Sequence, residues 1–206
     1  MPVATSKPER RLFPVYIAID ASGSMLQHGK WEVAFEMISQ SLEQIQRSPD
    51  PDYEMRMSIF ALHHDAIDKI TTDSPVNGIF LPDVETGGSS NYSKLLDELI
   101  IAVESGDYPP NSHPPCLVII GDGHVDETFD TKLDSALNNA LFKACTRMVV
   151  EIGSDFDPRS LKNFVSSPDN FFTVMDLSTM PLFYMRLAAR ITSQPSSSRS
   201  RRILAE

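Results

Sequence analysis

The sequence predicts one α/β domain, a doubly wound and mostly parallel sheet with helices on both faces and one short antiparallel edge strand. Two runs, 15–19 and 116–120, are continuously apolar and rich in β-branched residues, which is typical of strands buried on both faces. Amphipathic helical patterns follow them, and this alternation favours parallel strands joined by helices. A chain of 206 residues buries enough surface to fold without disulfides or a structural metal.

The first half of the domain predicts a strand, a helix and a hairpin. After the strand over 15–19, a helix over 30–47 shows one apolar face. Its apolar residues recur every three or four positions: Trp31, Phe35, Ile38, Leu42 and Ile45. Strands over 55–62 and 66–70 then pair across His63-His64-Asp65 as a hairpin.

The second half continues the alternation of helices and strands. In order, we expect a helix over 92–105, a strand over 116–120, a helix over 131–144, a strand over 147–152, a short helix begun by Asp157-Pro158, a strand over 171–175 and a helix over 180–191. The domain therefore spans 1–191, and the Ser/Arg-rich segment 192–206 lacks periodicity and predicts a disordered tail.

Composition narrows the class of partner and the compartment. The net charge of -10 argues against nucleic acid, because binding to its backbone needs an excess of Lys and Arg. No apolar run is long enough to span a membrane, and the polar segment 1–11 has no signal-peptide core. Cys116 and Cys145 lie in apolar stretches without a CxxC spacing, which predicts buried, reduced thiols. We therefore expect a cytoplasmic protein.

Polar side chains follow both of the continuously apolar strands. Asp20 comes directly after the first strand, and Asp122 comes just after the strand over 116–120. Ligands of open parallel sheets bind at the carboxyl ends of the strands, so the two carboxylates are expected to converge there. Three hydroxyl groups lie on turns at the same edge: Ser22, Ser24 and Ser89.

These side chains form a donor set for a divalent cation. Two carboxylates and three hydroxyls are hard oxygen ligands, which Mg²⁺ prefers and Mn²⁺ or Ca²⁺ also accept. Gly23 lets the chain turn so that Ser24 returns toward Asp20 and Ser22, and Gly87-Gly88 serves Ser89 in the same way. A carboxylate from another molecule would complete the coordination shell.

A simpler interpretation of the first segment is also open. Asp20-Ala21-Ser22-Gly23-Ser24 is typical of a turn whose side chains cap the next helix. That interpretation accounts neither for the second aspartate after a buried strand nor for the Gly-Gly-Ser segment before a helix. The three elements together favour the metal site.

The same residues resemble a known motif. Asp20-Ala21-Ser22-Gly23-Ser24, Ser89 and Asp122 are similar to the metal-ion-dependent adhesion site of von Willebrand factor A domains, written Asp-x-Ser-x-Ser, then Thr, then Asp. The resemblance covers about 11–191. It implies a Rossmann-like α/β fold and a metal-dependent protein-interaction module that captures an acidic group of a protein partner.

One position departs from the motif. The usual Thr is Ser89 here, and Ser90 stands beside it, so either serine could be the ligand. We favour Ser89, because Leu95 then occupies the apolar helix position of the family. Serine keeps the hydroxyl, and ligation is expected to survive the change.

A subgroup resemblance suggests a cellular context. Pro14-Val15-Tyr16, the Ile19–Met25 segment and the Ser-rich end look most like small bacterial tellurium-resistance-type members. This resemblance implies an adaptor in a bacterial stress or phosphorylation signalling system, with a protein kinase or a PP2C-type phosphatase as partner.

Enzyme classes fit the sequence less well, and we expect no catalysis. A Mg²⁺-dependent phosphohydrolase that uses Asp20 and Asp122 is the main alternative, but such enzymes need Asp-x-Asp, and the second aspartate is replaced by Ser22. The segment 87–91 fails the Gly-x-Ser-x-Gly pattern of serine hydrolases at its last position. Neither a Gly-x-Gly-x-x-Gly nor a P-loop motif occurs in the chain.

Several further side chains lie near the predicted site. His28 and His124 each follow a metal-loop element and would line its rim, although ordinary loop histidines are the simpler interpretation. Met25, Leu26 and Tyr92 are expected either as an apolar collar or as core residues. His63 and His64 are expected to be exposed residues of the hairpin.

Overall fold

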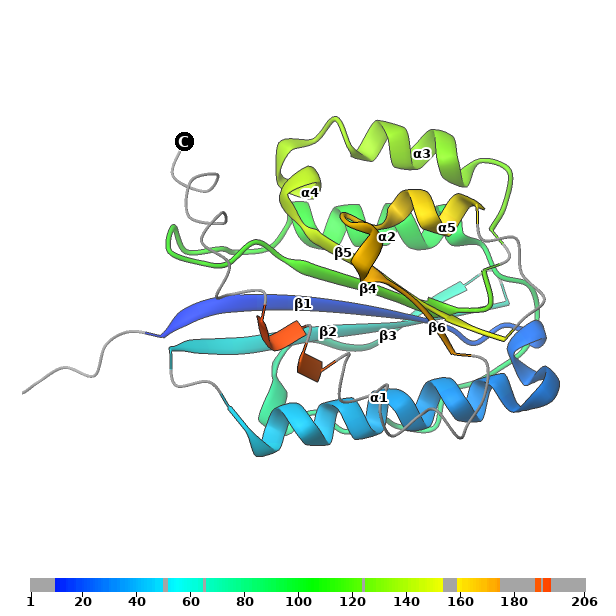
Figure 1. Ribbon diagram of the computed structural model, residues 1–206, viewed down its shortest axis with the longest axis horizontal. Coiled ribbons are helices and arrows are strands. Elements are labelled where there is room, and N and C mark those ends of the chain that lie inside the picture. Colours follow the sequence, from blue (N-terminus) through cyan, green and yellow to red (C-terminus); the bar gives the residue numbers. More distant parts are fainter. Residues whose placement is uncertain are drawn as a thin grey trace, which may run out of the picture.

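Six strands form one mixed sheet in the order β3-β2-β1-β4-β5-β6 (Figure 1). This computed structural model describes residues 10–49, 52–64, 66–123, 125–153, 159–174, 188–189 and 191–193. The strands are β1 (Arg11–Asp20), β2 (Tyr53–His63), β3 (Ala66–Pro75), β4 (Cys116–Gly121), β5 (Thr146–Ile152) and β6 (Phe171–Val174). Only the β2–β3 pair is antiparallel among these strands.

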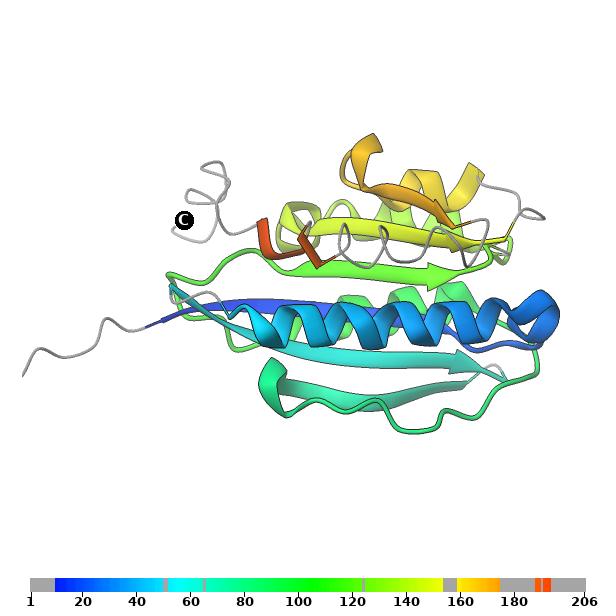
Figure 2. The ribbon, with the colours of Figure 1, turned by 60° about the horizontal axis from the view of Figure 1, so that its bottom comes forward.

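Helices cover both faces of the sheet. They are α1 (Lys30–Arg47), α2 (Tyr92–Glu104), α3 (Phe129–Ala136), α4 (Ala140–Ala144) and α5 (Arg159–Phe164), with short 3₁₀ segments η1 (Gly23–Gly29), η2 (Val76–Gly78) and η3 (Pro168–Asn170). α1 lies on one face, and the other four α-helices lie on the opposite face (Figure 1). Figure 2 shows α1 running along the length of the sheet. The predicted doubly wound α/β architecture is confirmed.

The core consists of two apolar layers separated by the sheet. Val15, Ile17 and Ile19 of β1 pack into the layer that holds α1, whereas Tyr16 and Ala18 pack into the layer that holds α2. Successive side chains of a strand point to opposite faces, so a strand covered on both faces must be apolar at every position. This explains the unbroken apolar runs of β1 and β4.

The buried face of α1 is rotated relative to the predicted one. Ile38, Leu42 and Ile45 are buried as expected, but Trp31 and Phe35 are only partly buried. The two rings pack against each other at the edge of the helix, with their centroids 5.8 Å apart. The buried stripe instead consists of Lys30, Val33, Ala34, Met37, Ile38, Ser41, Leu42 and Ile45. A lysine is therefore enclosed at the first position of this helix.

The antiparallel edge strand is longer than predicted. β3 extends to Pro75 rather than ending near residue 70, and its pairing with β2 contains two register shifts. Most of its side chains are partly or fully exposed. The polar segment 71–75 gives no apolar alternation, and the pattern therefore underestimated the strand.

The predicted helix over 131–144 is two helices. α3 ends at Ala136, and α4 starts after Asn139, whose side-chain oxygen accepts a hydrogen bond from the Phe142 N–H at 3.0 Å. The Asn139 amide also donates to Glu104 of α2 at 2.7 Å. An asparagine that caps a new helix breaks the longer pattern, since it offers the backbone an alternative to continuing the first helix.

The carboxyl-terminal predictions are covered only in part. Residues 157–158, most of the predicted helix over 180–191 and the tail 194–206 lie outside the described residues, whereas 188–189 and 191–193 are helical. Ala188 and Ile191 pack into the apolar layer of α1. In the described part of the chain, every helix is too short or too polar to cross a bilayer.

Asn139→Ala should lower the free energy of unfolding by about 1 kcal/mol, because α4 loses its cap. Denaturant titration measures the change. Asn138→Ala, an exposed neighbour outside the cap, is the matched control and should leave stability nearly unchanged. Equal effects of the two substitutions would contradict the capping role.

Candidate metal centre

The sheet topology brings Asp20 and Asp122 to one edge, as the sequence predicts. β1 and β4 are neighbouring parallel strands, with Ile19 opposite Ile120, so the residues that follow them meet at the carboxyl end of the sheet. Both side chains are only 1% exposed. This is the point at which the strand order reverses, where open α/β sheets bind their ligands.

The turn after β1 gathers three of the predicted oxygen ligands. Asp20 Oδ1 accepts a hydrogen bond from the Ser22 N–H at 2.8 Å, and the hydroxyls of Ser22 and Ser24 lie 3.0 Å apart. Ser22 stands at the N-cap of η1, but its side chain makes no capping hydrogen bond. The helix-cap interpretation of this segment therefore does not explain the position of Ser22.

Tyr92 holds the other oxygen of Asp20. Its hydroxyl donates to Asp20 Oδ2 at 2.8 Å, and the whole side chain is buried. Desolvation and the neighbouring Asp20 charge raise the pKa of Tyr92 well above its usual value, so the phenol remains a donor. Burial also raises the pKa of Asp20, against the opposing effect of its hydrogen bonds from Ser22 and Tyr92.

Asp122 has one satisfied oxygen and one unsatisfied oxygen. Its Oδ2 pairs with Lys30 Nζ at 3.4 Å, while Oδ1 is buried without a hydrogen-bond partner in the described part of the chain. A buried acceptor with no partner is costly, and such groups often mark the place of a ligand. The residues present thus fit a cation, because an uncompensated carboxylate oxygen lies beside a turn that carries hydroxyl groups.

A backbone clasp places the Gly87-Gly88 segment against the turn after β1. The Gly87 N–H donates to Ala21 O at 2.8 Å, and the Gly23 N–H donates to Gly88 O at 2.9 Å. Gly88 has φ +68°, and a Cβ there would lie 2.7 Å from the Cα of His64, so only glycine fits. Ser89 follows this clasp directly and is exposed. Ligation by Ser89 or by Ser90 stays a prediction.

The other side chains expected near the site fall into different environments. His28 is exposed, and His124 lies outside the described residues. Met25 is fully buried, whereas Leu26 is 50% exposed. Tyr92 belongs to the core, as one of the two expectations had it.

The expectation of two exposed hairpin histidines is wrong for one of them. His63 is buried, and its Nε2 lies 2.8 Å from Asp68 Oδ2. His64 is exposed and packs on the two glycines of the clasp, where Cβ atoms would meet its ring or backbone.

Three buried groups of this edge were not singled out for these roles from the sequence. Tyr92 supports Asp20, Lys30 pairs with Asp122, and Glu151 of β5 lies in register with Gly121. Glu151 is 0% exposed, and its Oε1 has no partner among the described residues. Burial, together with the Asp122 charge, raises the pKa of Glu151 to about 7. If Val33, Ala34 and Met37 had been included in the predicted apolar face of α1, that face would also have contained Lys30.

The donor set depends on hydroxyl oxygens. Among the described residues, no three of His, Cys, Asp and Glu gather in a metal-binding arrangement. The predicted set has only two carboxylates and takes its remaining ligands from serines. Such a set of oxygen ligands suits a hard cation, and it differs from metal sites whose ligands are imidazole or thiolate groups.

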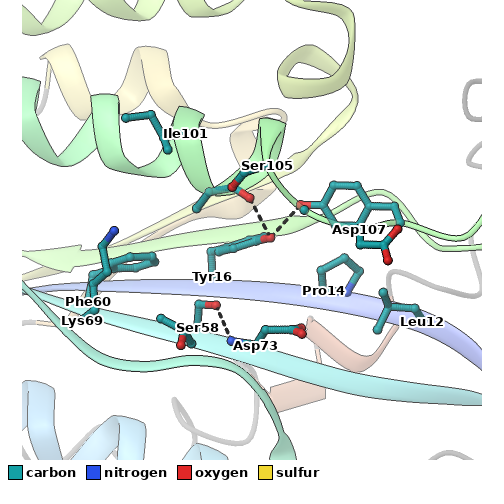
Figure 3. A pocket seen from close by; sticks show the side chains of 14 residues that line it. Leu12, Pro14, Tyr16, Ser58, Phe60, Lys69, Asp73, Ile101, Ser105 and Asp107 are labelled. Carbon is teal, nitrogen blue, oxygen red and sulfur yellow. Dashed lines mark hydrogen bonds between the residues drawn. The ribbon is translucent and has the colours of Figure 1, made fainter.

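A separate cavity of about 370 Å³ lies near the amino-terminal half of β1 and the end of α2 (Figure 3). Two pairs of its polar groups bond each other: the Tyr16 hydroxyl lies 2.6 Å from the Tyr108 hydroxyl, and Ser58 Oγ accepts from the Asp73 N–H at 3.0 Å. Lys69, also in its wall, pairs with Glu98 at 2.9 Å. The unsatisfied oxygen of Asp122 makes the carboxyl edge of the sheet the better candidate site.

Solved structures with the same fold include several von Willebrand factor A domains. The ArnB paralog VWA2 from Sulfolobus acidocaldarius is 18% identical with a TM-score of 0.63, over 82% of this chain and 43% of that chain. Proximal thread matrix protein 1 from the mussel byssus, with a zinc-occupied MIDAS motif, is 12% identical with a TM-score of 0.61, over 87% and 46%. The SpRpn10 VWA domain is 12% identical with a TM-score of 0.63, over 91% and 96%.

These similarities establish the fold. The chain has the Rossmann-like architecture of von Willebrand factor A domains, and it spans less than half of the archaeal and mussel chains that it matches. No protein-family model matches the sequence, and no curated protein matches it either.

Gly121→Ala should destabilise the protein by about 2–3 kcal/mol, because a methyl group there overpacks the site. The new Cβ would lie 2.2 Å from the Tyr92 hydroxyl and 2.8 Å from Asp20 Cβ. Thermal and denaturant unfolding measure the loss. Gly78→Ala is the matched control, since nothing lies within 4 Å of a Cβ at that position. A Gly121→Ala protein as stable as this control would contradict the packing described.

Glu151→Gln should stabilise the protein above neutral pH. The folded-state pKa of Glu151 is about 7, above its ordinary 4.5, so wild-type stability falls as the pH rises from the lower value through the higher one. The ionised, buried carboxylate then costs about 3 kcal/mol. The glutamine variant should gain most of that near pH 8, and the difference should vanish toward about pH 4.5.

The Glu151 comparison requires unfolding curves in EDTA across this pH range. Exposed Glu127→Gln is the control and should follow the wild-type pH profile. A stability difference between Glu151→Gln and wild type that does not vary with pH would contradict the elevated pKa.

Proposed function

We propose that this chain is a metal-dependent protein-interaction module. Asp20, Ser22, Ser24, Ser89 and Asp122 hold a divalent cation, and an acidic group of a partner protein completes its shell. The observation that carries the proposal is the buried, unpartnered Oδ1 of Asp122 at the edge that also holds Asp20 and the Ser22–Ser24 hydroxyl pair. The zinc-occupied MIDAS of the mussel protein with the same fold supports a divalent ion.

The donor chemistry favours Mg²⁺, with Mn²⁺ and Ca²⁺ as other ions that oxygen ligands accept. Two carboxylates and neutral hydroxyls leave a bound ion with Lewis acidity for one further ligand. The chain's own contribution is positional. Tyr92 fixes Asp20, and the glycine clasp holds Gly87-Gly88 against Ala21 and Gly23, next in sequence to Ser24.

The partner contact would be local and would not depend on long-range attraction. The net charge of -10 repels an acidic partner at a distance, so attraction has to come from the cation itself. Leu26, two positions after Ser24 and half exposed, offers apolar contact area at the rim of the proposed site. A kinase or PP2C-type phosphatase of a bacterial tellurium-resistance-type stress system is the partner class that we propose.

A cytoplasmic setting is part of this proposal. Cys116 and Cys145 are buried and are not joined in a disulfide, which suits a reducing compartment. Burial raises the pKa of the Cys145 thiol to about 12, so that it stays protonated and unreactive.

We also propose that the module has no catalytic activity. In the alternative phosphohydrolase, Asp20 would be the attacking nucleophile, but both of its oxygens accept hydrogen bonds and its side chain is 1% exposed. The residue two positions later is Ser22, whose hydroxyl cannot serve as a general acid near neutral pH.

Asp122→Asn should weaken Mn²⁺ binding by about tenfold or more, because the site loses one of its two carboxylates while the side chain keeps its shape. Isothermal titration and Mn²⁺ electron paramagnetic resonance measure the affinity. Exposed Asp134→Asn on α3 makes the same change in charge and should bind as wild type does. Wild-type protein that binds neither Mn²⁺ nor Mg²⁺ would overturn the proposal.

The interaction itself is tested by pull-down of the candidate kinase and phosphatase in Mg²⁺ and in EDTA. Wild type and Asp134→Asn should retain a partner in Mg²⁺ alone, and Asp122→Asn should not. Phosphomonoester hydrolysis is assayed on the same samples. Turnover by wild type that disappears in Asp122→Asn would favour the phosphohydrolase over the adhesion module.

A further inference from the structure

A buried lysine at the start of α1 pairs with one aspartate of the candidate metal centre. Lys30 is the first residue of α1 and is 5% exposed, and its Nζ lies 3.4 Å from Asp122 Oδ2. The two residues are 92 positions apart in sequence, so the tertiary fold creates this ion pair. Lysine is rarely buried unless it is paired.

The fold makes room for this side chain. Lys30 heads the buried stripe of α1, one helical turn before Val33 and Ala34. Gly153, just after β5, has φ +101°, and a Cβ there would lie 2.9 Å from Lys30 Cε and 3.5 Å from its Nζ. A glycine at this point therefore lets the lysine chain pass the end of β5 and reach Asp122.

The pair changes the charge that a cation would meet. Burial raises the pKa of Asp20, and repulsion from Asp122 adds a smaller increase. The Lys30 ammonium neutralises one of the two carboxylates while leaving Asp122 Oδ1 without a partner in the described residues. One oxygen of Asp122 thus pairs with Lys30, and the other has no hydrogen-bond donor among the described residues.

We propose that Lys30 is a built-in counter-ion of the metal site. It compensates Asp122 in the metal-free protein and lowers the affinity for the divalent cation, so that loading is readily reversible. This inference rests on the proposed function. An ammonium that shares a carboxylate with a divalent cation in a buried site repels it, because protein surroundings screen charge less than water does.

The test is Lys30→Met, which keeps most of the aliphatic chain and removes the charge. Mn²⁺ affinity should increase by about tenfold or more, since the cation no longer meets a neighbouring ammonium. In EDTA the variant should melt at a lower temperature than wild type, because the buried Asp122 carboxylate is left without its counter-ion. Saturating Mg²⁺ should raise its melting temperature more than it raises that of wild type.

Lys143→Met is the matched control. Lys143 is exposed on α4, which precedes β5 and so lies at the opposite end of the sheet from Asp122 (Figure 1). Its loss gives the same change in net charge and should leave the Mn²⁺ affinity unchanged. Lys30→Gln is the second variant at the site, and it decides the question if Lys30→Met does not fold.

The outcomes separate the two proposals. Wild type that binds Mn²⁺ while the folded Lys30 variant binds it equally or more weakly overturns the counter-ion role and leaves the metal-dependent module intact. Binding by neither wild type nor variant overturns both. Tighter binding by the Lys30 variant and not by Lys143→Met supports both.

Discussion

Two aspartates buried side by side at the ends of neighbouring parallel strands are the constraint around which this edge of the molecule is arranged. Carboxylates that are 1% exposed have lost their hydration, and these two also repel each other electrostatically. Specific donors stabilise both carboxylates. The Ser22 N–H and the Tyr92 hydroxyl donate to Asp20, and the Lys30 ammonium pairs with Asp122. Of the four oxygens of the two aspartates, Asp122 Oδ1 is the one without a partner among the described residues, and the proposed binding site rests on this atom.

Small residues make these compensations geometrically possible. Gly121 leaves space for the Tyr92 hydroxyl to reach Asp20, and Gly153 leaves space for Lys30 to reach Asp122. Gly88 brings the Ser89 segment against the turn after β1 with its backbone against His64. A side chain at Gly121, Gly153 or Gly88 would displace Tyr92, Lys30 or His64, respectively. The geometry of the candidate site therefore depends on these glycines as well as on the predicted oxygen ligands.

Much of this could be predicted from the sequence because it depends on chain-local patterns. Unbroken apolar strands that end in Asp20 and Asp122 indicate both the parallel sheet and the edge where the two residues meet. The roles of Lys30, Tyr92 and Glu151 could not be predicted in this way, since each depends on a contact across the fold with a residue distant in sequence. The split between α3 and α4 was missed for a different reason: the helical spacing of Leu133, Leu137 and Leu141 continues across a cap at Asn139.

The lysine also bears on why an acidic chain would recruit an acidic group. With Lys30 paired to Asp122, the two carboxylates together with the ammonium carry one net negative charge, and a divalent cation would turn the centre positive. An anionic ligand would then be required to neutralise it, and a carboxylate from a partner is the hard oxygen donor that suits both the cation and the charge. Without the lysine, the loaded site would be neutral and water would serve as well. In the proposed module, the same ammonium that weakens cation binding would therefore favour an acidic partner group over solvent once the cation is in place.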